Sequence, residues 1–189
     1  MKVTKEKAEE NRQQVIETSS RLFREKGFDG VGVSTLMQAA GLTHGGFYKQ
    51  FESKDDLIAK ATKAALDQTS QRMASLIGED RRASLEKAVG LYLSAQHRTG
   101  VADGCAFAAL GPDVARHGPE ARRVMQRGIK DQFTLLESLV KPEGEESSRE
   151  EAIATMATMV GALVLARAVE DTTLSNEILE AAAHSILQK

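Results

Sequence analysis

Hydrophobic residues recur at helical spacing along most of this chain, and the pattern predicts about nine helices. The first expected helix, residues 9–26, places Val15, Leu22 and Phe23 on one face and stops at Gly27. Further helices are expected over residues 53–77, 84–97, 105–117, 119–140, 153–169 and a final segment that carries Ile178 to Ile186. The polar segment 141–148, KPEGEESS, is expected to be a loop. The fold class predicted is therefore all-α.

Residues 33–51 predict two short helices that are joined by a tight turn. Leu36 and Met37 form an apolar stripe ahead of Gly41, which can adopt the left-handed backbone that ends a helix sharply. Thr43 can then cap the second short helix, and the positive end of that helix dipole suits a phosphate. This is the layout of a helix-turn-helix DNA reader.

Two glycines inside the second short helix support this interpretation. Gly45 and Gly46 each cost about 1 kcal/mol relative to alanine in a helix, but they allow its backbone to press closely against a groove wall. Phe47 and Phe51 are expected to point back into the core of the same domain.

Hydroxyl and ammonium donors follow directly, where phosphates flank a helix inserted in a groove. Tyr48 and Lys54 are the predicted phosphate anchors, with Lys49 between them. The alternative is an ordinary helical hairpin whose glycine-rich second helix is merely irregular.

Three segments in succession, LFREKGFDG, VSTLMQAAGLT and HGGFYKQFESKDDLIAKA, carry a specific pattern. Through them residues 15–61 resemble the N-terminal domain of the TetR family of bacterial transcriptional repressors. The resemblance implies that Thr43, Tyr48 and Lys54 contact phosphates and that His44 and Lys49 meet bases or the adjacent backbone. The full predicted DNA-binding set is Ser34, Thr35, Thr43, His44, Gly45, Gly46, Tyr48, Lys49 and Lys54.

One position departs from the family pattern. Gly32 stands where many members carry a serine or threonine cap on the second helix. Glycine at a cap costs only a few tenths of a kcal/mol relative to those residues, so this helix is still expected to form.

Composition and charge agree with this interpretation. The chain has 189 residues, 41% hydrophobic and 4% aromatic with no tryptophan, which favours helices rich in Ala, Leu and Val over strands. The net charge is −2, but residues 1–54 carry nine Lys or Arg against seven Asp or Glu, and the remainder carries 16 against 20. A head this weakly basic would bind DNA poorly alone, so two heads are expected to act together. The expected domains are a DNA-binding helix-turn-helix domain, residues 1–54, and a ligand-binding and dimerisation domain, residues 55–189.

The sequence pattern predicts neither a targeting segment nor a membrane-spanning segment. The first 13 residues are charged throughout and have no apolar leader segment, so the protein is expected to be cytoplasmic. The longest uncharged run, 152–166, contains threonines and falls short of the roughly 20 apolar residues needed to cross a bilayer. We therefore expect it to form a buried helix, with no membrane partner. The single cysteine, Cys105, excludes an internal disulfide.

The helix at residues 153–169 presents apolar or small residues in nearly every direction, so a second face needs a cover beyond the chain's own core. The simplest cover is a second copy in a two-fold four-helix interface, and the TetR resemblance implies the same. The alternative is that these positions fill a monomeric core. Arg167 is expected to pair with Glu170 or Asp171. The predicted interface residues are Ala157, Gly161, Ala162, Ile178, Ala182 and Ile186.

A dimer would place two reader helices in successive major grooves about 34 Å apart, so the operator should be an inverted repeat in double-stranded DNA. A small molecule that binds the spread conformation better would release the DNA, with the helix 53–77 as the lever. Candidate pocket residues, each equally compatible with plain core, are Leu91, Cys105, Phe107, Leu110, Met125, Ile129, Phe133 and Leu163.

Cys105 lies in a run, GCAFAALGPDVAR, that resembles a TetR subgroup in which a cysteine opens the sixth helix and some members respond to electrophiles or oxidants. A thiol at a helix N-terminus has a lowered pKa, although Asp103 beside it acts the other way. The alternative is a small, inert core residue.

Catalysis is the competing class of function. The histidines lack the spacing that places two metal ligands on one helical face, and no phosphate-cradling loop is present in the sequence. No enzyme activity, catalytic residue, metal or cofactor is therefore expected. The other alternative is a helical small-molecule binding protein without DNA function. Repression follows from the resemblance alone, and neither the operator sequence nor the effector can be derived from the residues.

Overall fold

The computed structural model describes residues 4–140 and 149–188, and all regular secondary structure in that part of the chain is helical. This confirms the all-α prediction. The loop predicted over 141–148 lies outside the described residues. The elements are α1 (Lys5–Lys26), α2 (Val33–Ala39), the 3₁₀ helix η1 (His44–Lys49), α3 (Lys54–Ala74), α4 (Arg81–Tyr92), α5 (Ala95–Thr99), α6 (Ala106–Arg116), α7 (Pro119–Val140), α8 (Arg149–Ala168) and α9 (Thr172–Leu187).

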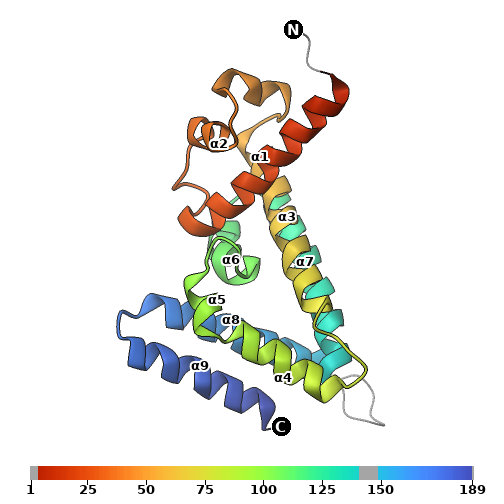
Figure 1. Cartoon of the computed structure of the whole chain (residues 1–189), viewed down its shortest axis with the longest axis vertical. Coiled ribbons are helices and arrows are strands. Elements are labelled where there is room, and N and C mark those ends of the chain that lie inside the picture. Colours follow the sequence, from red (N-terminus) through yellow and green to blue (C-terminus); the bar gives the residue numbers. More distant parts are fainter. Residues whose placement is uncertain (1–3, 141–148, 189) are drawn as a thin grey trace.

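Three elements, α1, α2 and η1, form a small head at one end of the molecule (Figure 1). Its core contains Phe23, Leu36 and Phe47, each fully buried. Gly27 ends α1 and Gly41 forms the turn after α2, both with φ of 72°. The predicted left-handed turn at Gly41 is therefore confirmed.

The second reader helix differs from the expectation in its geometry. It is a 3₁₀ helix, with hydrogen bonds from Gly46 N to Thr43 O and from Gln50 N to Phe47 O. Two glycines in six residues lower the helix propensity, and short segments of this kind adopt 3₁₀ turns readily. Thr43 occupies the N-cap position, but its side chain makes no capping hydrogen bond.

The helices α3 and α7 run side by side from the head to the opposite end of the molecule (Figure 1). The side chain of Ser53 caps α3 by accepting a hydrogen bond from Asp56 N, as the sequence predicted, and α3 ends three residues before the expected Ile77. Gly128 of α7 faces Leu66 of α3 so closely that an added Cβ would lie 2.9 Å from the Leu66 methyl carbons. Because α3 also packs on α1, it connects the head to the body.

The single helix expected over 84–97 is wrong, because the segment divides into α4 and α5. Ser94 lies between them, and its hydroxyl accepts a hydrogen bond from His97 N at 3.1 Å. A serine in this position offers the backbone an alternative to continuing the helix, and a new helix begins after it.

The segment between α5 and α6 is held by the imidazole of His97. Its Nε2 accepts a hydrogen bond from Cys105 N at 2.9 Å, so Nδ1 carries the proton and donates to Tyr92 O at 2.7 Å. Burial lowers the pKa of His97, and the positive charges of Arg167 and Arg72 lower it further, against the opposing effect of the bond to Tyr92 O. The neutral ring is therefore the form that the fold requires.

Arg167 does not pair with Glu170 or Asp171 as expected. Its guanidinium donates to Arg98 O at 3.0 Å and His97 O at 2.8 Å. Asp171 instead caps α9, where its carboxylate accepts from Thr173 N and Leu174 N. A carboxylate at a helix N-terminus is stabilised by the free N–H groups there, which accounts for the different partner.

Replacing Gly128 with alanine is expected to lower the free energy of unfolding by about 1–3 kcal/mol, because the new methyl group must displace the buried Leu66 side chain. Gly90→Ala in α4 is the control, since nothing lies within 4 Å of its added Cβ, and it should stabilise by up to about 1 kcal/mol. Urea unfolding at one fixed protein concentration measures both. A Gly128→Ala protein as stable as Gly90→Ala would contradict the close approach of α3 and α7.

The free energy of unfolding is expected to fall as the pH drops below 6.5, the ordinary pKa of a histidine such as His97. The folded pKa is lowered, so the unfolded chain takes up the proton first, and the loss grows until the pH passes the folded pKa. Urea unfolding across this pH range should show a smaller loss for His97→Gln than for the wild type. His184→Gln, which removes an exposed imidazole, should behave like the wild type. Equal pH dependence in all three proteins would count against the neutral ring.

Candidate nucleic-acid interface and small-molecule pocket

The outer edge of η1 presents a group of polar side chains to solvent. Tyr48 is 71% exposed, while its neighbour Phe47 is fully buried and packs edge-on against the Tyr48 ring at a centroid distance of 5.1 Å. The predicted burial of Phe47 and Phe51 is confirmed. The exposed members of the predicted set on this edge are Thr43, His44, Gly45, Tyr48 and Lys49, and Gly46 is half-buried. The buried rings thus fix the backbone whose other side carries the donors.

The first turn of α2 adds two exposed hydroxyls, those of Ser34 and Thr35. Gly32 is the N-cap of α2 and supplies no side-chain hydrogen bond, as expected from its lack of a side chain. The structure thus places both hydroxyls on the same small head as η1.

Lys54 differs from the other predicted DNA contacts. It is half-buried, and its ammonium donates to Phe28 O at 2.6 Å, which ties the start of α3 to the segment between α1 and α2. A lysine bound in this way supports the head from inside with one of its three N–H donors, and its predicted contact with a phosphate stays a prediction.

The sequence reasoning missed Arg12, which supports η1 from α1. Its Nε donates to Gln50 O at 3.3 Å, and its guanidinium lies over the Phe51 ring at 5.6 Å from the centroid. Arg12 precedes Ile16, Ser20 and Arg24 at helical spacing, and this row of positions toward the interior is the signal that could have identified it.

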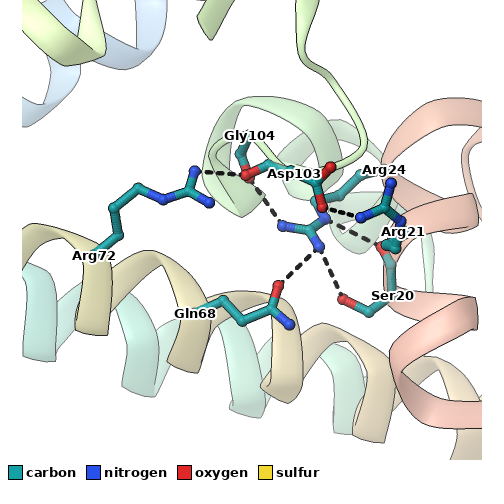
Figure 2. A network of polar contacts seen from close by, with 7 residues as sticks. All are labelled: Ser20, Arg21, Arg24, Gln68, Arg72, Asp103 and Gly104. Atoms are coloured by element: carbon teal, nitrogen blue, oxygen red, sulfur yellow. Dashed lines mark hydrogen bonds and ion pairs between the residues drawn. The ribbon is translucent and has the colours of Figure 1, made fainter. Parts of the chain in front are cut away.

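Figure 2 shows a polar network between the head, α3 and the segment before α6, centred on Arg24. Arg24 is 3% exposed and donates to Gly104 O at 3.0 Å, to Gln68 Oε1 at 3.0 Å and to the Ser20 hydroxyl at 3.3 Å. Burial lowers the pKa of Arg24, while the nearby carboxylate of Asp103 opposes that effect.

Two further arginines hold the same segment from opposite sides. Arg21 of α1 pairs with the Asp103 carboxylate, and Arg72 of α3 donates to Asp103 O at 2.6 Å. The main chain at 103–104 is therefore attached to both the head and α3 (Figure 2).

The other end of α6 also contacts the head. Asp113 accepts a hydrogen bond from Phe28 N at 3.2 Å, and the His117 ring packs edge-on against Phe28 at 4.9 Å. Because Cys105 at its N-terminus lines a pocket, α6 extends from that pocket to the head.

That pocket has a volume of about 430 Å³ and lies among α3, α4, α5 and the segment before α6. A volume of this size suits a small organic ligand. Two of the predicted pocket residues, Leu91 and Cys105, line it. The remaining walls are formed by Thr69, Arg72, Met73, Leu76, Ala88, Tyr92, Ser94, Gln96, His97, Gly100, Asp103 and Gly104.

A second cavity of about 20 Å³ lies beside the first and shares Thr69, Met73, Tyr92 and Cys105 with it. Phe107, another predicted pocket residue, lines this smaller space together with Gln132. The Tyr92 hydroxyl and Gln132 Oε1 have no hydrogen-bond partner of normal geometry in the described part of the chain. The space is large enough for a single water but not for an organic ligand.

The other predicted pocket residues line neither cavity. Leu110, Met125 and Leu163 are buried in the core, and Ile129 and Phe133 pack against that core while partly exposed. Phe133 is covered by Arg149, whose guanidinium lies 5.5 Å from the ring centroid. Apolar periodicity identified these positions as interior, but it does not distinguish a cavity wall from close packing.

The Cys105 thiol is buried, and burial raises its pKa despite the opposing contributions of Tyr92 and of the Ala108 and Phe107 backbone N–H groups. Burial also raises the pKa of Tyr92, and the neighbouring Cys105 adds to that effect. A thiol held in this way forms less thiolate, so the geometry favours the inert-core alternative over the reactive sensor.

The helices α8 and α9 lie at the end of the molecule far from the head (Figure 1), and several of their apolar side chains are exposed. On α8, Ile153, Val164 and Leu165 are 40%, 37% and 58% exposed, and Leu174 of α9 is 43% exposed. Ala157 is also exposed, while Gly161 and Ile178 are half-buried. Three predicted interface residues, Ala162, Ala182 and Ile186, are instead buried inside the chain, because they lie where α8 and α9 pack on their own neighbours.

Comparison with known proteins matches both the sequence of the head and the whole fold. Residues 15–61 match the family model for bacterial regulatory proteins of the tetR family. The chain is 35% identical over 57 residues to the transcriptional regulator AcrR of Shigella flexneri, and 24% identical over 130 residues to the transcriptional repressor NemR of Escherichia coli K12. These matches cover 30% and 67% of this chain, and 26% and 65% of the two relatives.

Solved structures match over almost the full length. A TetR transcriptional regulator from Chloroflexus aurantiacus is 27% identical, with a TM-score of 0.80 over 97% of this chain and 98% of that one. The reduced form of E. coli NemR is 23% identical, with a TM-score of 0.81 over 95% and 96% of the two chains, and it supports the fold. The sequence match places residues 15–61 in the TetR family of bacterial regulatory proteins, and the whole chain has the fold of solved TetR regulators.

Proposed function

We propose that this protein is a homodimeric transcriptional repressor that binds an inverted-repeat operator through its helix-turn-helix and releases it when a small molecule occupies the body. The observation that carries the proposal is the outer edge of η1, where exposed donors stand on a backbone fixed by two buried phenylalanine rings. The repressor names of relatives such as NemR support the sign of the regulation.

In this proposal the exposed edge of η1 enters the major groove. Thr43 and Tyr48 contact phosphates, while His44 and Lys49 meet bases or the adjacent backbone. Ser34 and Thr35 of α2 add hydroxyl donors to the same surface. Gly45 allows close approach, because its backbone carries no side chain and a Cβ added there would meet nothing within 4 Å in the free protein. Residues 1–54 act as the reading domain, and residues 55–189 bind the ligand and form the dimer.

The dimer is proposed to form through the outward faces of α8 and α9. The exposed residues Ile153, Ala157, Val164 and Leu165 recur at helical spacing on α8, and Leu174 extends the apolar surface onto α9. A second copy related by a two-fold axis would cover the same patch on both chains. Gly161 is half-buried beside this face and permits close approach of the helices.

By length and composition α8 is also long and apolar enough to cross a membrane. However, part of this helix is buried inside the chain, where α8 packs on α7 and α9. A helix with one face in the core of its own domain leaves the other face for protein packing, so a second copy is the favoured cover.

Release is proposed to act through the two connections between the pocket and the head. The main chain at 103–104 borders the pocket and is bound by Arg21 and Arg24 of α1, and α6 runs from the pocket to Phe28. A ligand that favours a different position of these segments would change the separation of the two heads. The ligand can shift the equilibrium only by its difference in affinity for the two conformations.

The purified protein should shift the DNA that flanks its own gene in a gel-retardation assay, and the affinity should fall steeply as salt rises, because lysines and arginines displace counterions from the phosphates. A helical ligand binder without DNA function would give no shift. The absence of any salt-sensitive binding would reject the repressor proposal.

Gly45→Ala should weaken that binding by about tenfold, because a methyl group would stand between η1 and the groove wall. Gly118→Ala is the matched control, since it also adds a Cβ into open space but lies at the body, before α7. Both proteins should keep the circular dichroism of the wild type, and neither should have a lower urea midpoint. Equal DNA affinity of the two variants would remove η1 from the proposed contact surface.

Leu165→Glu should convert the dimer to a monomer at micromolar concentration, because the change would bury an unpaired carboxylate between two apolar faces. Ile77→Glu is the control, since Ile77 is 39% exposed and lies outside α8 and α9. Sedimentation velocity over a range of concentrations measures both. A Leu165→Glu protein that stays dimeric would place the interface elsewhere.

A further inference from the structure

The segment from His97 to Gly104 is surrounded by guanidinium groups that are bound to neutral acceptors. Arg24 donates to Gly104 O, Arg72 to Asp103 O, and Arg167 to both His97 O and Arg98 O. A carbonyl oxygen satisfies the hydrogen-bonding groups of an arginine but carries no formal charge to balance it. These contacts therefore leave positive charge uncompensated around the segment.

Asp103 is the one carboxylate among the residues that line the 430 Å³ pocket, and it is already engaged. Its Oδ1 pairs with Arg21, which approaches from α1 and does not line the pocket (Figure 2). His97, on the same wall, is held neutral by burial and by the repulsion of Arg167 and Arg72. The balance of charge at this end of the pocket is consequently positive.

Arg72 is the positively charged residue of the pocket lining that has hydrogen-bond donors left for a ligand. Its side chain is exposed, lines the pocket and makes one hydrogen bond, from Nη1 to Asp103 O, among the contacts of the described residues. The donors on Nε and Nη2 are thus free to bind a ligand, and a guanidinium presents such donors in the geometry that a carboxylate accepts.

The pocket also has an apolar part. Its lining includes Met73 of α3, Leu76 just after that helix, and Ala88 and Leu91 of α4. Leu91 is 51% exposed, a large aliphatic side chain left open to solvent at this site. Burial of such a surface by the apolar part of a ligand is favourable at about 25 cal/mol per Å².

We propose that the pocket binds a small organic anion, with its carboxylate on Arg72 and its aliphatic or aromatic body along Met73, Leu76 and Leu91. This assignment rests on the proposed function, in which the pocket holds the effector. It also gives the ligand a direct effect on the network, because a carboxylate on the free donors of Arg72 would draw the guanidinium that holds Asp103 O. Loosening Asp103 changes the segment that Arg21 and Arg24 hold against the head.

The test uses three probes of equal chain length, octanoate, 1-octanol and octylammonium, with the purified full-length protein in the absence of DNA. Isothermal titration calorimetry should give octanoate a dissociation constant about tenfold lower than that of 1-octanol, because a charged hydrogen bond is added to the same apolar contact. Octylammonium should bind more weakly than 1-octanol.

Arg72→Gln should remove the preference for octanoate while leaving the affinity for 1-octanol unchanged, which shows that the pocket remains intact. Arg72→Lys should keep a reduced preference, since it retains the charge without the fork of donors. Arg127→Gln is the matched control, because it removes an exposed arginine on α7 that does not line the pocket, and it should keep the full preference.

Saturable binding of octanoate that Arg72→Gln does not weaken, preferential binding of octylammonium, or no saturable binding of octanoate would each overturn the proposal. Because these titrations contain no DNA, their failure leaves the gel-retardation result unaffected. Conversely, octanoate binding by a protein that does not shift DNA would retain the ligand class and reject the repressor function.

Discussion

The close packing of α3 against α7, where Leu66 lies against Gly128, is the contact around which the molecule is organised. This contact holds α3 as a straight connection between the head and the far end of the body (Figure 1). The same helix contributes Gln68 to the Arg24 network and Arg72 and Met73 to the pocket wall. A single element therefore packs against the head, contributes to the polar network and lines the pocket, so the proposed release would act through a helix that contacts all three.

The polar network before α6 removes the Arg24 guanidinium from water and requires acceptors at defined positions to compensate for the lost hydration. Arg24 is buried without a carboxylate in direct contact, so its charge is held by carbonyl, amide and hydroxyl oxygens from three separate elements. Such an arrangement is stable only when all of its acceptors are in place, because a buried unpaired guanidinium loses several kcal/mol of hydration. The arrangement makes the position of the 103–104 segment depend on α1 and α3 together, which suits a segment that borders a pocket.

The apolar residues of α8 fall into two classes in the structure, one buried in the chain's own core and one exposed on its surface. Ala162 faces inward and fills the core of the chain, whereas Val164 and Leu165 face outward. Both classes of residue carry the same hydrophobic signal, but only the outward class is available to a second copy. Similarly, the exposed polar residues of η1 and the buried phenylalanines are neighbours in sequence. The phenylalanines fill the core of the head, and the polar residues face solvent on the other side.

The all-α class, the turn at Gly41, the cap at Ser53, the burial of Phe47 and Phe51, and the resemblance to TetR proteins could all be read from the sequence, because they depend on residues close together in the chain. The partners of the polar groups follow only from the packing of the folded chain. Lys54 binds Phe28 O, Arg167 binds the carbonyls of His97 and Arg98, and Asp171 caps α9. The same packing decides which apolar positions line a cavity and which fill the core. Helical periodicity reports that a side chain faces inward, but its neighbours there can come from segments 80 or more residues away, as for Arg24 and Gly104, and only the packed chain brings them together.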